Sequence, residues 1–209
     1  MAKLLSAKDK LLSAKEQRDA VPRSEMILDE AAKLFAAKGY DGTSVQDIAT
    51  AVGITKASLY HFFKDKSEIH STVVTLSVVR LNDLVQEKLA TCRTASDKVE
   101  GFARAHAQHI SENTALYFAS ALGYNELTNP EVKAQVQRMR DGYEATLRRI
   151  IREGIQTGEF RDLDVKVAAR AVISCLNWMA RWWRPDGPDS AEKTASDYVH
   201  LIIQGFLPR

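Results

Sequence analysis

Residues 43–69 read TSVQDIATAVGITKASLYHFFKDKSEI, and the pattern of this stretch decides which fold we expect. Thr43 and Gln46 have the spacing of a capping box, which predicts the start of a short helix. Gly53 can take the left-handed backbone conformation that a tight turn requires, and Thr55 then predicts the N-cap of a second short helix. Two short helices joined by a glycine turn are typical of a helix-turn-helix.

The apolar residues of this stretch are spaced to face the inside of a small helical domain, and those expected to do so are Ile48, Val52, Ile54, Leu59 and Phe62. In a helix-turn-helix, the second helix lies in the major groove of DNA with its N-terminal residues at the base edges. The residues expected to face the groove are Thr55, Lys56, Ala57, Ser58, Tyr60 and His61. The alternative is that they are ordinary polar groups on the surface of a helical domain.

The same stretch resembles the signature of TetR-family transcriptional repressors. The resemblance implies that Tyr60 and His61 reach the phosphate backbone and that Phe62 and Phe63 help to build the domain core. It also implies phosphate contacts from Lys66 and from Thr43 and Ser44 at the start of the first of the two short helices, where free backbone N–H groups favour an anion. The DNA-binding set expected from the groove helix and the resemblance together is Thr43, Ser44, Thr55, Lys56, Ala57, Ser58, Tyr60, His61, Lys64 and Lys66.

Caps and helix breakers along the chain predict an all-α fold of about nine helices. Asn129 followed by Pro130 is one well-marked start, because it supplies a cap and a proline at the first helical position. The expected helices are 24–39, 43–52, 55–63, 65–92, 96–111, 114–124, 130–156, 164–183 and 190–206. The resemblance implies three parts, which are an N-terminal arm (1–22), a three-helix helix-turn-helix DNA-binding domain (23–68) and a helical ligand-binding and dimerisation domain (69–209).

The expected helix 164–183 has polar side chains along one narrow stripe only, so most of its circumference must be covered by other residues. The resemblance implies that this helix and the last one pair with their symmetry mates in a four-helix bundle. The expected dimer contacts are Val172, Cys175, Met179, Tyr198, Leu201, Ile202 and Phe206. A two-fold dimer would present two groove helices to neighbouring half-sites and predicts a palindromic operator.

The helices between residues 96 and 183 are expected to enclose a chamber for a small-molecule effector. The candidates for its lining are Phe102, His106, Ile110, Phe118, Leu122, Arg138, Tyr143, Asn177, Trp178, Arg181 and Trp182. Aromatic and apolar residues at helical spacing also fit a plain core, so each of these residues has that second interpretation. The expected fourth helix begins near the DNA and ends beside the chamber, which makes it the expected lever between the two sites.

Residues 177–187 read NWMARWWRPDG, which resembles the end of helix eight in TetR regulators that respond to fatty-acyl or other acyl-CoA thioesters. The resemblance implies an apolar tunnel together with cations for the CoA phosphates. Some arginines of the region also fit ordinary ion pairs on a helix surface, as between Glu144 and Arg148. Another hydrophobic effector, or an activator of the same family, therefore stays open.

Composition narrows the function classes further. Lys and Arg number 29 against 27 Asp and Glu, and this balance is too even to indicate nucleic-acid binding by itself. Cys92 and Cys175 give neither a disulfide framework nor a metal cluster, and no nucleophile–base pair or phosphate-binding glycine loop favours an enzyme or a cofactor. The chain has no apolar run long enough for a membrane span and no signal peptide, so we expect a cytoplasmic protein without a membrane partner.

The first residues contain an echo, with LLSAKDK at 4–10 and LLSAKEQ at 11–17. One interpretation is a loosely ordered arm. The other is an extra helix that adds phosphate contacts through Lys8, Lys10 and Lys15.

Overall fold

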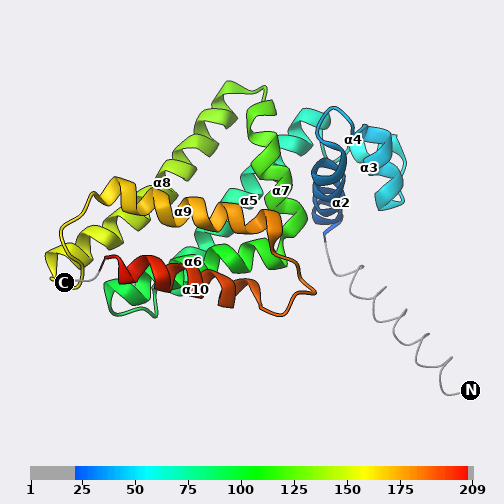
Figure 1. The fold of residues 1–209 in the computed structure, drawn as a ribbon. Coiled ribbons are helices and arrows are strands. Elements are labelled where there is room, and N and C mark those ends of the chain that lie inside the picture. The colour runs from blue at the N-terminus through cyan, green and yellow to red at the C-terminus, as the bar shows by residue number, and fades with distance from the viewer. Residues whose placement is uncertain (1–21, 207–209) are drawn as a thin grey trace, which may run out of the picture.

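The structure, a computed structural model that describes residues 22–206, consists of a small head and a larger body (Figure 1). The head comprises α2 (Arg23–Lys38), α3 (Val45–Val52) and α4 (Lys56–Tyr60). The body comprises α5 (Lys66–Leu89), α6 (Ala95–Glu112), α7 (Thr114–Gly123), the 3-10 turn η1 (Tyr124–Glu126), α8 (Pro130–Gln156), α9 (Val165–Trp182) and α10 (Ala191–Gln204). The described residues contain no strand, and the all-α prediction is confirmed. The repeat at 4–17 lies outside them.

Several predicted boundaries agree closely with the structure because strong caps mark them. The Asn129 side chain accepts hydrogen bonds from the backbone N–H groups of Glu131 and Val132, and α8 covers the predicted range 130–156. The start of α3 differs by one residue from the prediction. Ser44 rather than Thr43 is the N-cap, and it forms a reciprocal capping box with Asp47.

Helix α4, which is predicted to enter the DNA groove, is shorter than the predicted span to residue 63. The carbonyl oxygen of Leu59 accepts hydrogen bonds from the N–H groups of both Phe62 and Phe63, which closes a turn after Tyr60. This turn points Phe63 into the core, whereas Phe62 is 46% exposed. The expectation that Phe62 faces inward is therefore wrong, and Phe63 alone of the pair fills the core.

The head core extends into the body through α7. Ile27, Phe35 and Leu59 of the head pack in one buried cluster with Leu116 and Ala119 of α7. A second and larger cluster lies inside the body and is built mainly by α6, α8, α9 and α10. Because α7 packs against both α2 and α5, it connects the head directly with the body.

No helix between residues 22 and 206 is long and apolar enough to cross a bilayer.

Candidate functional site

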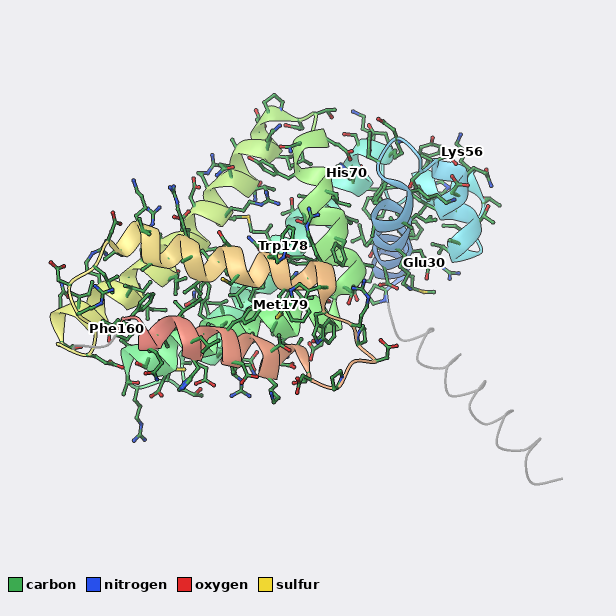
Figure 2. All side chains as sticks on the ribbon, in the orientation of Figure 1. Glu30, Lys56, His70, Phe160, Trp178 and Met179 are labelled. Atoms are coloured by element: carbon green, nitrogen blue, oxygen red, sulfur yellow. The ribbon has the colours of Figure 1, made fainter. Side chains whose placement is uncertain are left out.

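The surface predicted to contact DNA lies on α3, α4 and the turn after α4, at the opposite end of the molecule from the α8–α9 connection (Figure 1). Figure 2 shows Lys56 on the outside of the head. Ser58 is half-buried. The predicted residues that are exposed on the head are Ser44, Thr55, Lys56, Ala57, Tyr60, His61 and Lys64.

Thr55 sets the direction in which α4 starts. Its hydroxyl accepts a hydrogen bond from the backbone N–H of Ser58 at 3.0 Å and lies 2.9 Å from the Ser58 hydroxyl. The Lys56 ammonium is 5.9 Å from the centre of the Tyr60 ring. The N-terminal turn of α4 therefore presents a fixed hydroxyl cap and a cation beside an exposed aromatic ring, which are groups that contact base edges and phosphates in DNA complexes.

Two residues of the predicted DNA-binding set are engaged inside the head. Thr43 is 1% exposed, and its hydroxyl donates a hydrogen bond to the Gly39 carbonyl at 2.9 Å. Its predicted phosphate contact does not fit this burial. The Lys66 ammonium donates to the carbonyl oxygens of Tyr40 and Thr43, both at 2.9 Å, and lies 4.1 Å from the centre of the Tyr40 ring. Lys66 thus ties the start of α5 to the α2–α3 connection.

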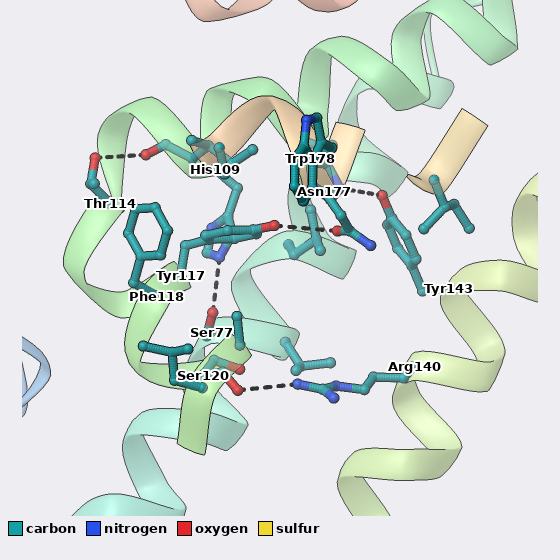
Figure 3. A pocket seen from close by; sticks show the side chains of 18 of the residues that line it. Ser77, His109, Thr114, Tyr117, Phe118, Ser120, Arg140, Tyr143, Asn177 and Trp178 are labelled. Carbon is teal, nitrogen blue, oxygen red and sulfur yellow. Dashed lines mark hydrogen bonds between the residues drawn. The ribbon is translucent and has the colours of Figure 1, made fainter. Parts of the chain in front are cut away.

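The body contains a cavity of about 1160 Å³, open to solvent on one side, between α5, α6, α7, α8 and α9, seen from close by in Figure 3. Its volume is slightly above the usual range of small-molecule pockets and is far too large for a packing defect. The predicted ligand-binding residues that line it are His106, Ile110, Phe118, Leu122, Tyr143, Asn177, Trp178 and Arg181.

Three predicted ligand-binding residues lie outside the cavity lining. Phe102 is fully buried in the body core, where its ring centre is 4.5 Å from that of Tyr143. Trp182 is exposed beside Tyr198, with 5.9 Å between ring centres. Arg138 is exposed on α8.

The polar groups of the cavity that sequence reasoning missed include Arg140 and Tyr117. Arg140 donates to the Ser120 carbonyl at 3.2 Å, as Figure 3 shows, and Tyr117 donates to the Asn177 side-chain oxygen at 3.2 Å. The helical register could have found Arg140. It shares the inward stripe of α8 with the buried Val136 and Tyr143, at steps of four and three residues.

Burial keeps the interior groups of the cavity uncharged. It lowers the pKa of His106 to about 3 and that of His109 to about 4. It raises the pKa of Tyr117 to about 12 and that of Tyr143 well above its ordinary value. All four side chains are therefore neutral near pH 7. The cavity wall also carries charge of both signs, from Arg140, Arg181 and Arg184 and from Asp141 and Glu144.

The α9 helix has two apolar faces, and only one of them is covered by the protomer. Val172 and Met179 are fully buried in the body core, and Phe206 is 8% exposed. These three predicted dimer contacts pack inside one protomer, and this burial does not fit a contact with a partner subunit. Cys175, Tyr198 and Ile202 are half-buried. The large exposed apolar residues of α9 and α10 are Val167, Trp178, Trp182 and Leu201.

Two protein-family models match the chain. The model for bacterial regulatory proteins of the tetR family matches residues 27–71, and the tetracyclin repressor-like C-terminal domain matches residues 92–206. The chain is also 30% identical over 188 residues to the HTH-type transcriptional repressor KstR2 of Mycolicibacterium smegmatis, a match that covers 88% of this chain and 90% of the repressor.

Solved structures agree with this assignment. The TetR family transcriptional regulator PfmR from Thermus thermophilus is 43% identical with a TM-score of 0.80, over 88% of this chain and 99% of PfmR. AibR in complex with isovaleryl coenzyme A and operator DNA has the same fold, with 24% identity and a TM-score of 0.75 over 86% of this chain and 97% of AibR. These relatives are regulators rather than enzymes, and the chain belongs to the TetR family of bacterial transcriptional regulators.

Proposed function

We propose that this protein is a repressor that binds palindromic operator DNA as a homodimer and leaves it when an acyl-CoA thioester enters the body cavity. The observation that carries the proposal is the presence, in one chain, of an exposed groove helix and a large cavity, joined by the helices α5 and α7. A ligand and DNA can then oppose each other if they prefer different arrangements of these helices.

The exposed apolar residues of α9 and α10 support the homodimer. Val167 is 64% exposed, Trp178 62% and Leu201 71%. Large side chains of this kind are costly to leave in water when they gather on neighbouring helices. A second copy would offer the same residues around a two-fold axis and cover both sets.

The cavity chemistry supports an acyl-CoA effector. Apolar side chains such as Ile110 and Phe118 suit an acyl chain, whereas Arg140, Arg181 and Arg184 can pair with phosphates. A volume of about 1160 Å³ leaves room for a ligand of that size. AibR, which has the same fold, has a crystal structure in complex with isovaleryl coenzyme A and operator DNA, and this relation favours the same ligand class here.

Coupling between the two sites is expected to pass through α7. Phe118 and Leu122 of this helix line the cavity, whereas Leu116 and Ala119 pack in the head core. At its end, Gly123 lies so close to α5 that a Cβ atom there would come 2.3 Å from the Nε2 atom of His70. A ligand that displaces α7 would therefore move the head relative to the body.

Selection of genomic DNA fragments by the purified protein, followed by fluorescence anisotropy, tests this function. We expect a two-fold symmetric sequence bound by one dimer, and release by a medium-chain acyl-CoA but not by free CoA. A monomer that selects no fragment would contradict the repressor proposal. Selective binding that no acyl-CoA weakens would contradict only the effector.

A further inference from the structure

The cavity contains a polar group with an unmet hydrogen bond. The side chain of His106 is 2% exposed and lines the cavity from α6. Its Nδ1 atom lies 2.6 Å from the Tyr143 hydroxyl. Its Nε2 atom is buried and has no hydrogen-bond partner among residues 22–206. A buried polar atom in this state is rare in native proteins and points to a missing partner.

The hydrogen-bond partners of His106 favour one of its two tautomers. The Tyr143 hydroxyl has one hydrogen-bond partner among the described residues, which is His106. Burial keeps both groups neutral, since it lowers the pKa of His106 to about 3 and raises that of Tyr143. If the Tyr143 hydroxyl donates to Nδ1, the hydroxyl proton is used and Nε2 carries the imidazole proton. The opposite tautomer would leave the hydroxyl proton without an acceptor.

His109, one helical turn further along α6, repeats the arrangement. Its Nε2 atom lies 3.0 Å from the Ser77 hydroxyl, and its buried Nδ1 atom has no partner in the described part of the chain. His70 also has an unpartnered nitrogen, but it packs against Phe35 and Tyr40 and does not line the cavity. The unmet hydrogen bonds of His106 and His109 are therefore a property of the cavity wall.

We propose that His106 is a specificity-determining residue for the effector, to whose uncharged carbonyl oxygen it donates a hydrogen bond from Nε2–H, with Tyr143 fixing the donating tautomer. The proposal rests on the effector role of the cavity proposed above and adds the group that is recognised. A carbonyl oxygen suits this neutral N–H donor, because the rings beside His106, those of Tyr117 and Tyr143, are neutral too, whereas the arginines of the cavity wall are left to pair with phosphates. In an acyl-CoA, this oxygen is that of the thioester.

A matched pair of ligands tests the carbonyl directly. Decanoyl-CoA and S-decyl-CoA differ in the thioester oxygen, and their affinities are measured by calorimetry and by operator release. We expect the thioester to bind the natural protein about tenfold or more tightly, because the thioether leaves the imidazole donor unpaired. His106→Leu should remove this preference. His106→Gln, which keeps an N–H donor, should restore part of it.

The outcomes separate this inference from the proposed function. Equal affinity for both CoA compounds in the natural protein overturns the role of His106 and leaves the acyl-CoA effector intact. If neither compound binds, the acyl-CoA effector is contradicted. The role of the carbonyl is then tested by comparing the thermal stabilisation of the protein by a medium-chain methyl ketone with that by the alkane of the same length. Nitrogen NMR of the unliganded protein gives the tautomer of His106 without any variant. A proton on Nδ1 overturns the proposed donor.

Discussion

Lys66 and Lys56 are expected to have different roles. Lys66 should stabilise the fold, and Lys56 should contact DNA. Lys66 donates to two carbonyl oxygens of the α2–α3 connection, whereas Lys56 is exposed on α4. We expect Lys66→Met to lower the free energy of unfolding by about 1–2 kcal/mol and to weaken binding to every DNA sequence. Lys56→Met should leave the unfolding free energy unchanged, alter base preference and lower the salt slope by about one. Urea unfolding and anisotropy titrations in salt measure both. Equal stability of the two variants would contradict the structural role of Lys66.

The buried histidines predict how stability depends on pH. Burial holds the pKa of His106 at about 3 and those of His70 and His109 at about 4, below the unfolded value of 6.5. The unfolded chain therefore binds more protons than the folded one between these values, so stability falls as pH falls below 6.5. The expected slope between pH 6 and 5 is on the order of 1.4 kcal/mol per pH unit for each histidine. Urea unfolding at several pH values gives this slope, and a flat profile in that range would contradict the neutral burial.

Single residues of the site were predictable from sequence where a local rule determines their position. The caps Asn129 and Thr55 fall where the sequence predicts them, because a cap needs only its own neighbours in the chain. The side chains of Phe62 and Phe63 could not be assigned in the same way. Both are apolar and adjacent, and the turn that separates them depends on how α4 and α5 pack.

At the scale of elements, the contact between α7 and α5 is expected to set the coupling between cavity and head. Gly123→Ala would bring a Cβ atom 2.3 Å from the Nε2 atom of His70, so either the buried His70 ring must shift or the two helices must separate. We expect a loss of stability of about 1–3 kcal/mol and weaker operator binding. Gly142→Ala on α8 is the matched control, because a Cβ atom there meets nothing within 4 Å. It should be neutral or stabilise the helix by about 0.5–1 kcal/mol.

A second substitution tests whether His70 is the obstacle. Adding His70→Ala to Gly123→Ala makes space for the new methyl group, and the double variant should recover operator affinity relative to Gly123→Ala. Anisotropy titrations of the natural protein, the two single variants and the double variant give the coupling energy between the two substitutions. Additive effects would mean that the contact does not transmit the displacement.

The two faces of α9 mark the limit of what an element's own sequence predicts. Its single polar stripe predicts a helix covered on most sides, but one protomer covers only the face that carries Val172, Leu176 and Met179. However, Val172 and Met179 are as apolar as Val167 and Trp178, and composition cannot decide which pair meets the protomer core. Only the packing of α6, α8 and α10 against one face makes the other the candidate interface. In the same way, the arginines of α8 cannot be assigned to the cavity or to solvent until it is known which face of that helix is buried.

For the whole molecule, the proposed homodimer links the exposed face of α9 and α10 to operator affinity. Val167 and Leu201 lie on this face, and neither lines the cavity. We expect Val167→Asp and Leu201→Asp each to shift the protein towards monomers, because a carboxylate would be buried at a self-complementary apolar contact. Sedimentation velocity measures the shift. Gln86→Asp, at an exposed position of α5, adds the same charge away from the face and should leave the dimer intact.

Loss of the dimer should weaken binding to a full operator far more than it weakens binding of a single head to a half-site. A two-fold dimer places two α4 helices on neighbouring half-sites, so the second contact forms at high effective concentration. Monomeric Val167→Asp should therefore bind a full operator with the affinity that the natural protein has for an isolated half-site. Anisotropy with full and half operators compares the two affinities. A monomeric variant that keeps full operator affinity would show that one head suffices and would contradict the proposed pairing of half-sites.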